Sequence, residues 1–329
     1  MDASGAAVWG IAEAGEVEAA EMERFDRFIA EGRHASMDYL ARYREIRFNP
    51  LRLLEGEPRQ GAVIVGAFPY AAEYDPGPGA DRIARYALGD DYHDTLRKRL
   101  RPAAAILRDA GFQARVCVDS APILERYWAV RAGLGAIGLN RQLAVPGLGT
   151  YLFLAEIVTD APRTSLLPGA SLKAPFPPSC ARRKPSEEAE LPVGLSELQR
   201  AASQRPACSG CGACAAACPT GALAPDGTFD GRLCVNYLTI EHRGPLPASL
   251  NARGSEIPTR EILKGVLYGC DRCQESCPLN RGINASPLPE FLPRPALLSI
   301  TSAKLEALTP EDRAELLRRS PLRRGLNRR

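Results

Sequence analysis

Cysteine residues show the clearest chemical pattern in this sequence. Eight of the ten lie between positions 208 and 277, in two related runs. The first run, CSGCGACAAACP, has the spacing C-x2-C-x2-C-x3-C-P, with its thiols at Cys208, Cys211, Cys214 and Cys218. In such a run three thiolates on a tight turn reach three irons of one cubane, and the fourth thiolate ligates a neighbouring cluster. The run therefore predicts four ligands divided between two 4Fe–4S clusters.

The second run, CDRCQESCP, holds Cys270, Cys273 and Cys277 and lacks the first cysteine of a complete run. Cys234, further upstream, can supply that ligand. Each run then gives its last cysteine to the other cluster, so one cluster is expected on Cys208, Cys211, Cys214 and Cys277. The other cluster is expected on Cys218, Cys234, Cys270 and Cys273. Paired CxxC motifs also bind zinc, but the two C-x3-C-P endings and the crossed ligand count favour iron–sulfur clusters.

Two cysteines lie outside this scheme, and we interpret Cys117 as a strand residue and Cys180 as a loop thiol. Two neighbouring clusters carry single electrons, and they do no bond chemistry while cysteines ligate every iron. The electron acceptor is therefore expected in the first 160 residues.

A glycine-rich run, GLGAIG (133–138), has the spacing of a dinucleotide-binding loop. That loop follows a strand, so that a helix N-terminus meets the pyrophosphate. Here the run follows ILERYWAVRA, which reads as a helix, so the glycines end a helix instead of opening one. Asp160 lies at about the right distance for a ribose-binding acid, but no clean strand–acid pattern accompanies it. NAD binding is therefore disfavoured.

The elements that must position these groups alternate along the first part of the chain. Helical spacing of apolar residues is found within 20–45, 90–111 and 121–133, and strands are expected over 61–70, 113–119 and 150–158. This alternation predicts an α/β domain over residues 1–160. Three further parts are expected: a linker or long surface loop (161–206), a bacterial ferredoxin-like α+β domain with two clusters (207–290), and a C-terminal tail with one amphipathic helix and a basic end (291–329).

Bulk properties favour a soluble protein of ordinary composition. The net charge of +3 points to no partner by itself. No stretch approaches about 18 consecutive apolar residues, so no membrane span is expected. The acidic N-terminus lacks the positive charge of a signal peptide and a twin-arginine pair. We expect a cytoplasmic monomer.

Several segments together resemble the epoxyqueuosine reductase family. The longest is VDSAPILERYWAVRAGLGAIGLN (118–140), and MDYL, RIARYALGDDYH, CPTGAL, CVNYLTIEHRG and GCDRCQESCPLN follow the family's order over most of residues 20–285. A generic ferredoxin has no reason to carry YLTIEHRG or GCDRCQ. The resemblance implies a cobalamin-dependent enzyme with two 4Fe–4S clusters. Such an enzyme reduces epoxyqueuosine to queuosine at the wobble position of tRNA, and its N-terminal α/β domain binds cobalamin.

The resemblance also implies a catalytic acid. Opening the epoxide to an alkene and water consumes two electrons and protons, so a carboxylic acid should lie near the cobalt. The matching residue is Asp119, which follows a strand beside an apolar helix, a place that suits a raised pKa. From the residues alone, Asp119 reads first as the N-cap of the following helix.

Weaker expectations follow from the same motifs. Cobalamin contacts, besides Asp119, are expected from Asn140, Asn236, Asp271 and Arg272. Arg126 would line the site, and His93 is expected to be a substrate or corrin contact, or a satisfied helix residue, and not a cobalt ligand. His242 and Arg243 suit tRNA phosphates. The basic tail, with seven Arg against one Glu over 313–329, is either a solvated end or a further tRNA contact.

Two other functions remain open at this point. One is a reductive dehalogenase-like reductase with the same cofactors and a small organohalide substrate; those enzymes usually carry a twin-arginine signal, which this sequence lacks. The other is a ferredoxin-type electron carrier, which would bind clusters but no cobalamin. An unidentified flavodoxin- or ferredoxin-type donor is expected to supply the electrons.

Overall fold

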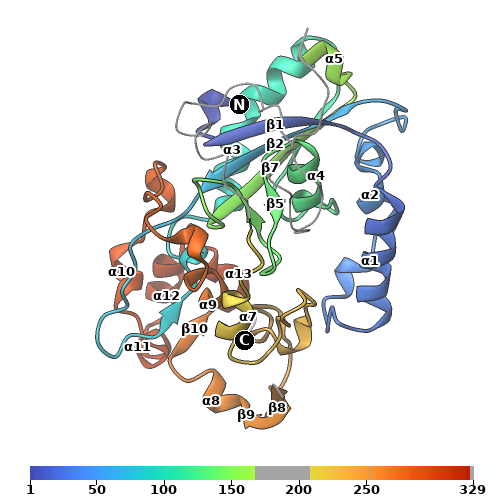
Figure 1. Cartoon of the computed structure of the whole chain (residues 1–329). Coiled ribbons are helices and arrows are strands. Elements are labelled where there is room, and N and C mark those ends of the chain that lie inside the picture. The colour runs from blue at the N-terminus through green and yellow to red at the C-terminus, as the bar shows by residue number, and fades with distance from the viewer. Residues whose placement is uncertain (167–207, 253, 327–329) are drawn as a thin grey trace.

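A four-stranded sheet forms the centre of the computed structural model, which describes residues 1–166, 208–252 and 254–326 (Figure 1). The strand order is β1-β2-β7-β4, and each neighbouring pair is antiparallel. The strands are β1 (Val8–Glu13), β2 (Ala62–Pro69), β7 (Leu152–Thr159) and β4 (Ala114–Cys117). The last three confirm the strands expected from the sequence. β1 is an additional strand at the edge.

Side chains of β2 alternate between two apolar clusters, one on each face of the sheet. Val65 lies in one cluster with Trp128 of α4 (Glu125–Arg131). Ile64 lies in the other cluster, to which α3 (Tyr92–Asp109) contributes its apolar stripe. Because strand residues point to opposite faces in turn, a strand that is buried throughout needs cover on both sides. The expected layering of helices on a sheet is confirmed, with the sheet itself antiparallel.

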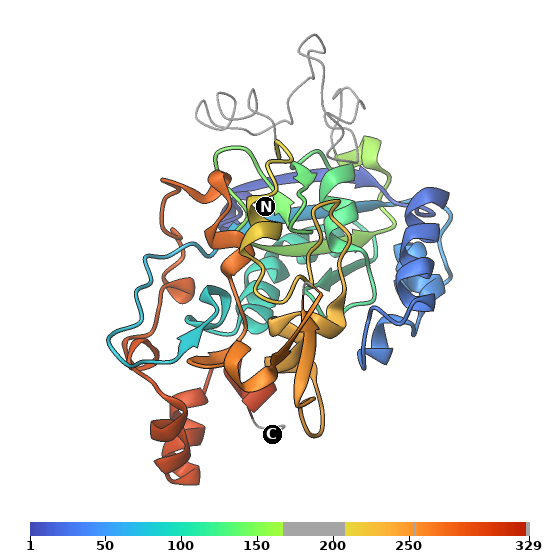
Figure 2. The ribbon, with the colours of Figure 1, turned by 60° about the horizontal axis from the view of Figure 1, so that its bottom comes forward.

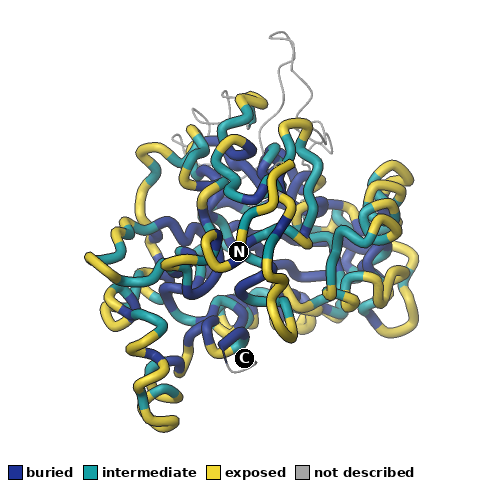
Figure 3. Tube along the Cα trace, turned by 90° about the horizontal axis from the view of Figure 1, so that it is seen from below, coloured by how far each residue is buried: buried dark blue, intermediate teal, exposed yellow. Residues whose placement is uncertain are grey.

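The segment 20–45 does not form one continuous helix. It divides into α1 (Ala19–Ala30), the 3-10 turn η2 (Asp38–Leu40) and α2 (Arg44–Phe48). None of the residues of α1 is buried. Figures 1 and 3 show these helices as an arm beside the sheet, with α1 alternating between exposed and partly buried residues.

The cysteine-rich segment is built from short elements joined by long connections (Figure 2). The helical pieces are α7 (Ala213–Ala217), η5 (Gly231–Leu233), the π-helical turn η6 (Tyr237–Glu241), α8 (Thr259–Ile262) and α9 (Arg272–Glu275). A hairpin is formed by β8 (Ser249–Ala252) and β9 (Ser255–Pro258). A further strand, β10 (Val266–Tyr268), pairs in parallel with β3 (Arg82–Ile83) from the N-terminal part. This pairing joins segments that are far apart in sequence.

The tail is helical, as expected, but several short helices stand in place of the one amphipathic helix, and its last residues (327–329) lie outside the described residues. The tail forms α10 (Pro295–Leu298), α11 (Ser302–Ala307), α12 (Pro310–Leu317) and α13 (Leu322–Leu326). Pro310 starts α12, and Pro321 separates α12 from α13, because proline cannot continue a helix. Their leucines are buried against Ile83, Leu88 and Tyr268. The described part of the tail is therefore a packed element of the fold.

The other described strands are β5 (Ala136–Ile137) and β6 (Leu143–Ala144), which pair with each other, and the other described α-helix is α5 (Arg163–Leu166). Short 3-10 helices are also described: η1 (Asp2–Ser4), η3 (Pro50–Leu53), η4 (Arg85–Ala87), η7 (Pro278–Asn280) and η8 (Pro289–Phe291). Most of the expected linker, 167–206 with Cys180, lies outside the described residues. Within the described ranges, none of the helices combines the length and the apolar character that crossing a membrane requires.

Candidate active site

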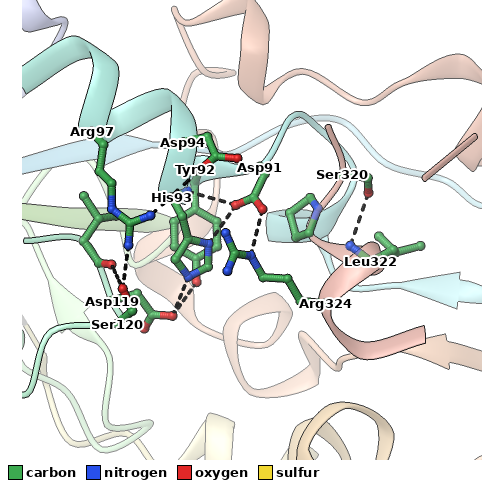
Figure 4. Close-up of polar contacts among 12 residues, drawn as sticks. Asp91, Tyr92, His93, Asp94, Arg97, Asp119, Ser120, Ser320, Leu322 and Arg324 are labelled. Atoms are coloured by element: carbon green, nitrogen blue, oxygen red, sulfur yellow. Dashed lines mark hydrogen bonds and ion pairs between the residues drawn. The ribbon is translucent and has the colours of Figure 1, made fainter. Parts of the chain in front are cut away.

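Asp119 lies in the connection between β4 and α4, with its backbone in the left-handed region at φ 57°. Its side chain is 55% exposed. Oδ2 accepts a hydrogen bond from the Tyr92 hydroxyl at 2.9 Å and another from Nε2 of His93 at 3.0 Å (Figure 4). Within the described part of the chain, no hydrogen bond to Oδ1 is found. One oxygen is thus held, and the other is available to a ligand.

Behind His93 a second carboxylate continues the hydrogen-bonded chain. Nδ1 of His93 donates to Oδ1 of Asp91 at 2.7 Å, and Nε of Arg324 donates to Oδ2 of Asp91 at 2.8 Å. Asp91 is also the N-cap of α3, since its side chain accepts from the backbone N–H of His93. An arginine from the last described helix thus supports a carboxylate at the start of α3.

The charges of these four hydrogen-bonded residues set their pKa values. Burial opposes ionisation of Asp91, but its hydrogen bonds to His93 and Arg324 outweigh burial and hold its pKa at about 2. Burial likewise opposes the charged form of His93, yet the hydrogen bonds to Asp119 and Asp91 raise its pKa. The raised pKa of His93 favours its imidazolium form, which in this arrangement lies between two carboxylates.

The expectation of a raised pKa for Asp119 is therefore wrong. Burial raises the pKa, but the hydrogen bond and charge of His93 outweigh it, so that the pKa of Asp119 is lowered. The helix-cap interpretation is wrong as well, because α4 starts after Leu124 and has no side-chain cap. Instead the Asp119 backbone N–H donates to Oε1 of Glu125 at 2.5 Å.

The first predicted set of cluster ligands comes together in the fold. Cys208, Cys211, Cys214 and Cys277 line one small hollow. α7, which carries Cys214, packs against α9, and Cys277 follows α9 directly. The hollow thus brings together the three cysteines of the first run and the last cysteine of the second run, as a cluster with crossed ligands requires.

The second predicted set also gathers. Burial raises the pKa of the Cys273 thiol, and Cys270, Cys234 and Cys218 raise it further, which places all four within electrostatic range of one another. Among the described residues, no group of three or more His, Cys, Asp or Glu side chains is arranged to hold a single metal ion. The thiols thus gather in two places, and thiolate donors suit iron–sulfur clusters; which thiol binds which cluster stays a prediction.

Asn140 lines the first hollow. It is not part of the hydrogen-bond network around Asp119. Its Oδ1 accepts from the backbone N–H of Gln142 at 3.1 Å, and its buried Nδ2 has no hydrogen-bond partner among the described residues. A buried donor without a partner is costly, and Nδ2 lies beside the hollow lined by Cys208. This amide therefore fits a cluster contact better than the expected cobalamin contact.

Asn236, Asp271 and Arg272 lie near one another. Oδ1 of Asn236 is close to Gly269, just before the second cysteine run. Asp271 is buried and accepts from the backbone N–H of Arg85 at 2.6 Å; burial raises its pKa to about 6. Arg272 is exposed at the start of α9. Asp271 therefore attaches α9 to the Arg85 segment, while Arg272 and Asn236 are more open to a ligand.

The two residues expected to contact tRNA differ in how firmly hydrogen bonds hold their side chains. His242 is fixed by the Tyr237 hydroxyl at 3.2 Å from Nδ1 and by the Pro245 carbonyl at 3.1 Å from Nε2. Arg243 is exposed and donates only to nearby backbone carbonyls among the hydrogen bonds described. Arg126, expected to line the site, donates to the carbonyl of Arg141 at 2.6 Å.

Sequence reasoning missed Asp91, Tyr92 and Arg324 as neighbours of Asp119. A signal for two of them was present in the motif DDYH, where an N-cap aspartate precedes a tyrosine and a histidine. No local signal marks Arg324, because it lies 233 residues from Asp91.

These features define an iron–sulfur protein with two ligand sets and a separate polar site on an α/β domain. Residues 207–280 match the family described as "4Fe-4S double cluster binding domain", and residues 47–120 match "Epoxyqueuosine reductase QueG, DUF1730". Among curated proteins, the epoxyqueuosine reductase of Cyclobacterium marinum is 30% identical over 96% of this chain and 87% of its own length. That of Pseudomonas aeruginosa is 33% identical over 94% of this chain and 76% of its own length.

Solved structures agree with the sequence matches. The epoxyqueuosine reductase of Streptococcus thermophilus superposes with a TM-score of 0.72 and 25% identity, covering 98% of this chain and 75% of that one. An epoxyqueuosine reductase crystallised with an epoxyqueuosine-modified tRNA-Tyr stem loop gives the same TM-score and identity, covering 97% of this chain and 74% of that one. The chain belongs to the epoxyqueuosine reductase family and is an oxidoreductase.

Proposed function

We propose that this chain reduces epoxyqueuosine to queuosine at the wobble position of tRNA, with two 4Fe–4S clusters and cobalamin as cofactors. The observation that carries the proposal is Asp119, a carboxylate with one free oxygen, in a chain that also gathers two sets of four thiols. Membership of the epoxyqueuosine reductase family supports it. The balanced change is epoxide plus two electrons and two protons to alkene plus water.

When bound, the clusters and cobalamin would supply the two electrons of this reduction, which a flavodoxin- or ferredoxin-type donor would provide. Cys208, Cys211, Cys214 and Cys277 would hold one cluster, and Cys218, Cys234, Cys270 and Cys273 the other. The half-buried side chain of Asn236 and the exposed side chain of Arg272 would offer an amide and a guanidinium to the amide groups of a corrin, and Asp119 would offer its free Oδ1. This donor chemistry fits both cofactors.

The chain's own residues supply the proton at the epoxide oxygen. We propose that Asp119 donates it from the oxygen that faces the ligand, while Tyr92 and His93 hold the other oxygen. His93 lies at 3.0 Å from Oδ2 and returns a proton to Asp119 through that hydrogen bond. Closing the site with substrate removes water, which favours the neutral carboxylic acid and restores its ability to donate. Asp91 and Arg324 keep His93 in the orientation that this transfer needs.

A surface for tRNA lies within electrostatic range of Asp119. Burial raises the pKa of Tyr39 to about 12, Glu241 and Asp119 raise it further, and Arg243 acts to lower it. Tyr39 is 49% exposed and Tyr43 66% exposed, which is high for aromatic side chains. Unpaired anticodon bases are recognised by stacking on aromatic rings, and their phosphates by arginines. We propose that Tyr39, Tyr43, His242 and Arg243 form the tRNA surface.

The deciding experiment is nucleoside mass spectrometry on epoxyqueuosine-containing tRNA. The tRNA is incubated anaerobically with reconstituted wild type, Asp119→Asn or Asp109→Asn, the last being a matched control at the far end of α3. Queuosine is expected from wild type and the control. Asp119→Asn should form it at least about 100-fold more slowly, since a positioned general acid contributes about 10²–10⁴-fold.

Other outcomes would decide among the alternatives. Equal rates in all three proteins would remove Asp119 as the acid and leave the substrate assignment intact. No queuosine from protein shown to hold both clusters and cobalamin would overturn the tRNA substrate and favour a small-molecule reductase. Failure to bind cobalamin at all would favour a ferredoxin-type electron carrier.

A further inference from the structure

A wholly buried glutamate lies behind the Asp119 site. Glu156 is at the middle of β7, with 0% exposure, between Val65 of β2 and Cys117 of β4. Neither of its carboxyl oxygens has a hydrogen-bond partner of ordinary geometry among the described residues. A buried carboxylate without partners is unstable as an ion, so a group in this position is neutral. The sheet therefore contains a protonated carboxylic acid that the proposed reaction does not yet use.

A second glutamate connects Glu156 with the active site. Glu125 is the first residue of α4, and its Oε1 accepts the backbone N–H of Asp119 at 2.5 Å. Burial raises the pKa of Glu125 to about 8, and the charge of Asp119 acts in the same direction. Burial raises the pKa of Glu156 too, followed by the effect of the Glu125 carboxyl.

We propose that Glu125 and Glu156 form a carboxylic-acid pair that stores a proton for Asp119, and that Glu125 acts through Asp119 as its second proton source. The inference rests on the proposed reduction of the epoxide. That reaction breaks the carbon–oxygen bonds and releases the oxygen as water, so it consumes two protons. Two titratable groups contact Asp119: His93 hydrogen-bonds its side chain, and Glu125 accepts its backbone N–H. Their number matches the two protons consumed.

The charged and titratable groups around the pair come from several elements. Glu125 is surrounded by Asp119, Arg126, His93 and Tyr92. Arg126 and His93 favour the ionised form of Glu125, whereas burial and Asp119 favour the neutral form and prevail. Glu156 is surrounded by Glu125, Asp119 and Cys117. None of these residues is a proposed cluster ligand.

Infrared spectroscopy of the reconstituted holoenzyme without substrate tests whether the pair holds protons. Wild type, Glu125→Gln and Glu156→Gln are titrated with pH, and the carbonyl band of protonated carboxylic acids is followed. Glu13→Gln, an exposed residue of β1, is the matched control. Wild type and the control should keep two acid bands at pH 7, and each variant of the pair should lose one. Identical acid bands in all four proteins would overturn the proposal.

The pH dependence of a single turnover tests whether the stored proton is used. Glu125→Gln keeps an oxygen that can accept from the Asp119 N–H but cannot donate a proton as an acid. We expect its rate to fall at lower pH than that of wild type, with at least about a tenfold deficit at pH 8 and unchanged tRNA affinity. A profile that superposes on wild type would refute the role of Glu125. If wild type forms no queuosine, the proposed function fails, while the infrared bands still decide the protonation of the pair.

Discussion

At the scale of single residues, the candidate site contains several carboxyl groups whose pKa values differ because their surroundings differ. Asp91 and Asp119 share an imidazolium and are ionised, whereas Glu125 and Glu156 have raised pKa values and no cationic partner of comparable effect. When their environments separate the pKa values of neighbouring groups, one group can act as an acid and another as a base. The pKa of Asp119 is thus lowered while the pKa values of its neighbours His93 and Glu125 are raised.

Glu156 should make the stability of the protein depend on pH. Its pKa is raised above the ordinary 4.5, so between pH 4.5 and its folded-state pKa the folded chain binds a proton that the unfolded chain releases. Stability therefore falls as pH rises through this window, by up to about 1.4 kcal/mol per pH unit from this residue. Glu156→Gln should abolish that part of the loss. Melting temperatures are measured anaerobically from pH 5 to pH 8. The melting temperature of the variant relative to that of wild type should increase as pH rises. A constant difference across this range would contradict the prediction, and Glu13→Gln should follow wild type.

At the scale of elements, the last described helix supports the first turn of α3. Arg324 of α13 pairs with Asp91, and Gly325 brings the α13 backbone against the Tyr268 ring, since a Cβ there would lie 2.6 Å from Tyr268 Cε2. Arg319, just before α13, pairs with Asp90. The basic residues here serve as internal partners for the DDYH segment, and their number alone does not indicate nucleic-acid contact.

Removing this contact should destabilise the protein in a pH-dependent way. The pKa of Asp91 is about 2 against an ordinary 3.8, so its stabilisation is fully present above pH 3.8 and is lost as pH falls toward 2. Arg324→Ala should cost about 1 kcal/mol near neutral pH, a value kept low because the arginine side chain is 39% exposed. Thermal melting at pH 7 should show a lower melting temperature. Arg323→Ala, one residue earlier and exposed, is the control. Equal melting temperatures of the two variants would show that the Arg324–Asp91 contact does not stabilise the protein.

Local patterns predicted the parts of this molecule that depend on neighbouring residues. The two cysteine runs and the apolar strands could be read from spacing, because ligand spacing and strand burial are encoded within a few residues. The lowered pKa of Asp119 could not be predicted in this way, because it depends on His93, which lies 26 residues earlier in the sequence. The packed tail escaped prediction for the same reason: its leucines are recognisable, but their partner Ile83 is more than 200 residues away.

At the scale of the whole molecule, contacts distant in sequence join the cysteine-rich segment to the sheet. β10 pairs with β3, and Oδ1 of Asn280 accepts the backbone N–H of Thr150 at 2.7 Å just before β7. The expected domains 1–160 and 207–290 therefore share structure along their boundary. In the proposed function this connection matters, because electrons must pass from the cluster ligands to the side of the sheet that presents Asp119.

The contribution of the proposed tRNA surface to binding can be measured. With a net charge of only +3, the chain attracts RNA through local cations more than through overall charge. Arg243→Ala should weaken tRNA binding and reduce the slope of log affinity against log salt by about 0.7–0.9, as loss of one phosphate contact does. Arg260→Ala, at an 85% exposed arginine on α8, should leave both unchanged. Filter binding at several salt concentrations measures both quantities. If the two variants bind alike, the η6 end of the cysteine-rich segment is not part of the tRNA surface, and recognition must come from the Tyr39–Tyr43 side of Asp119.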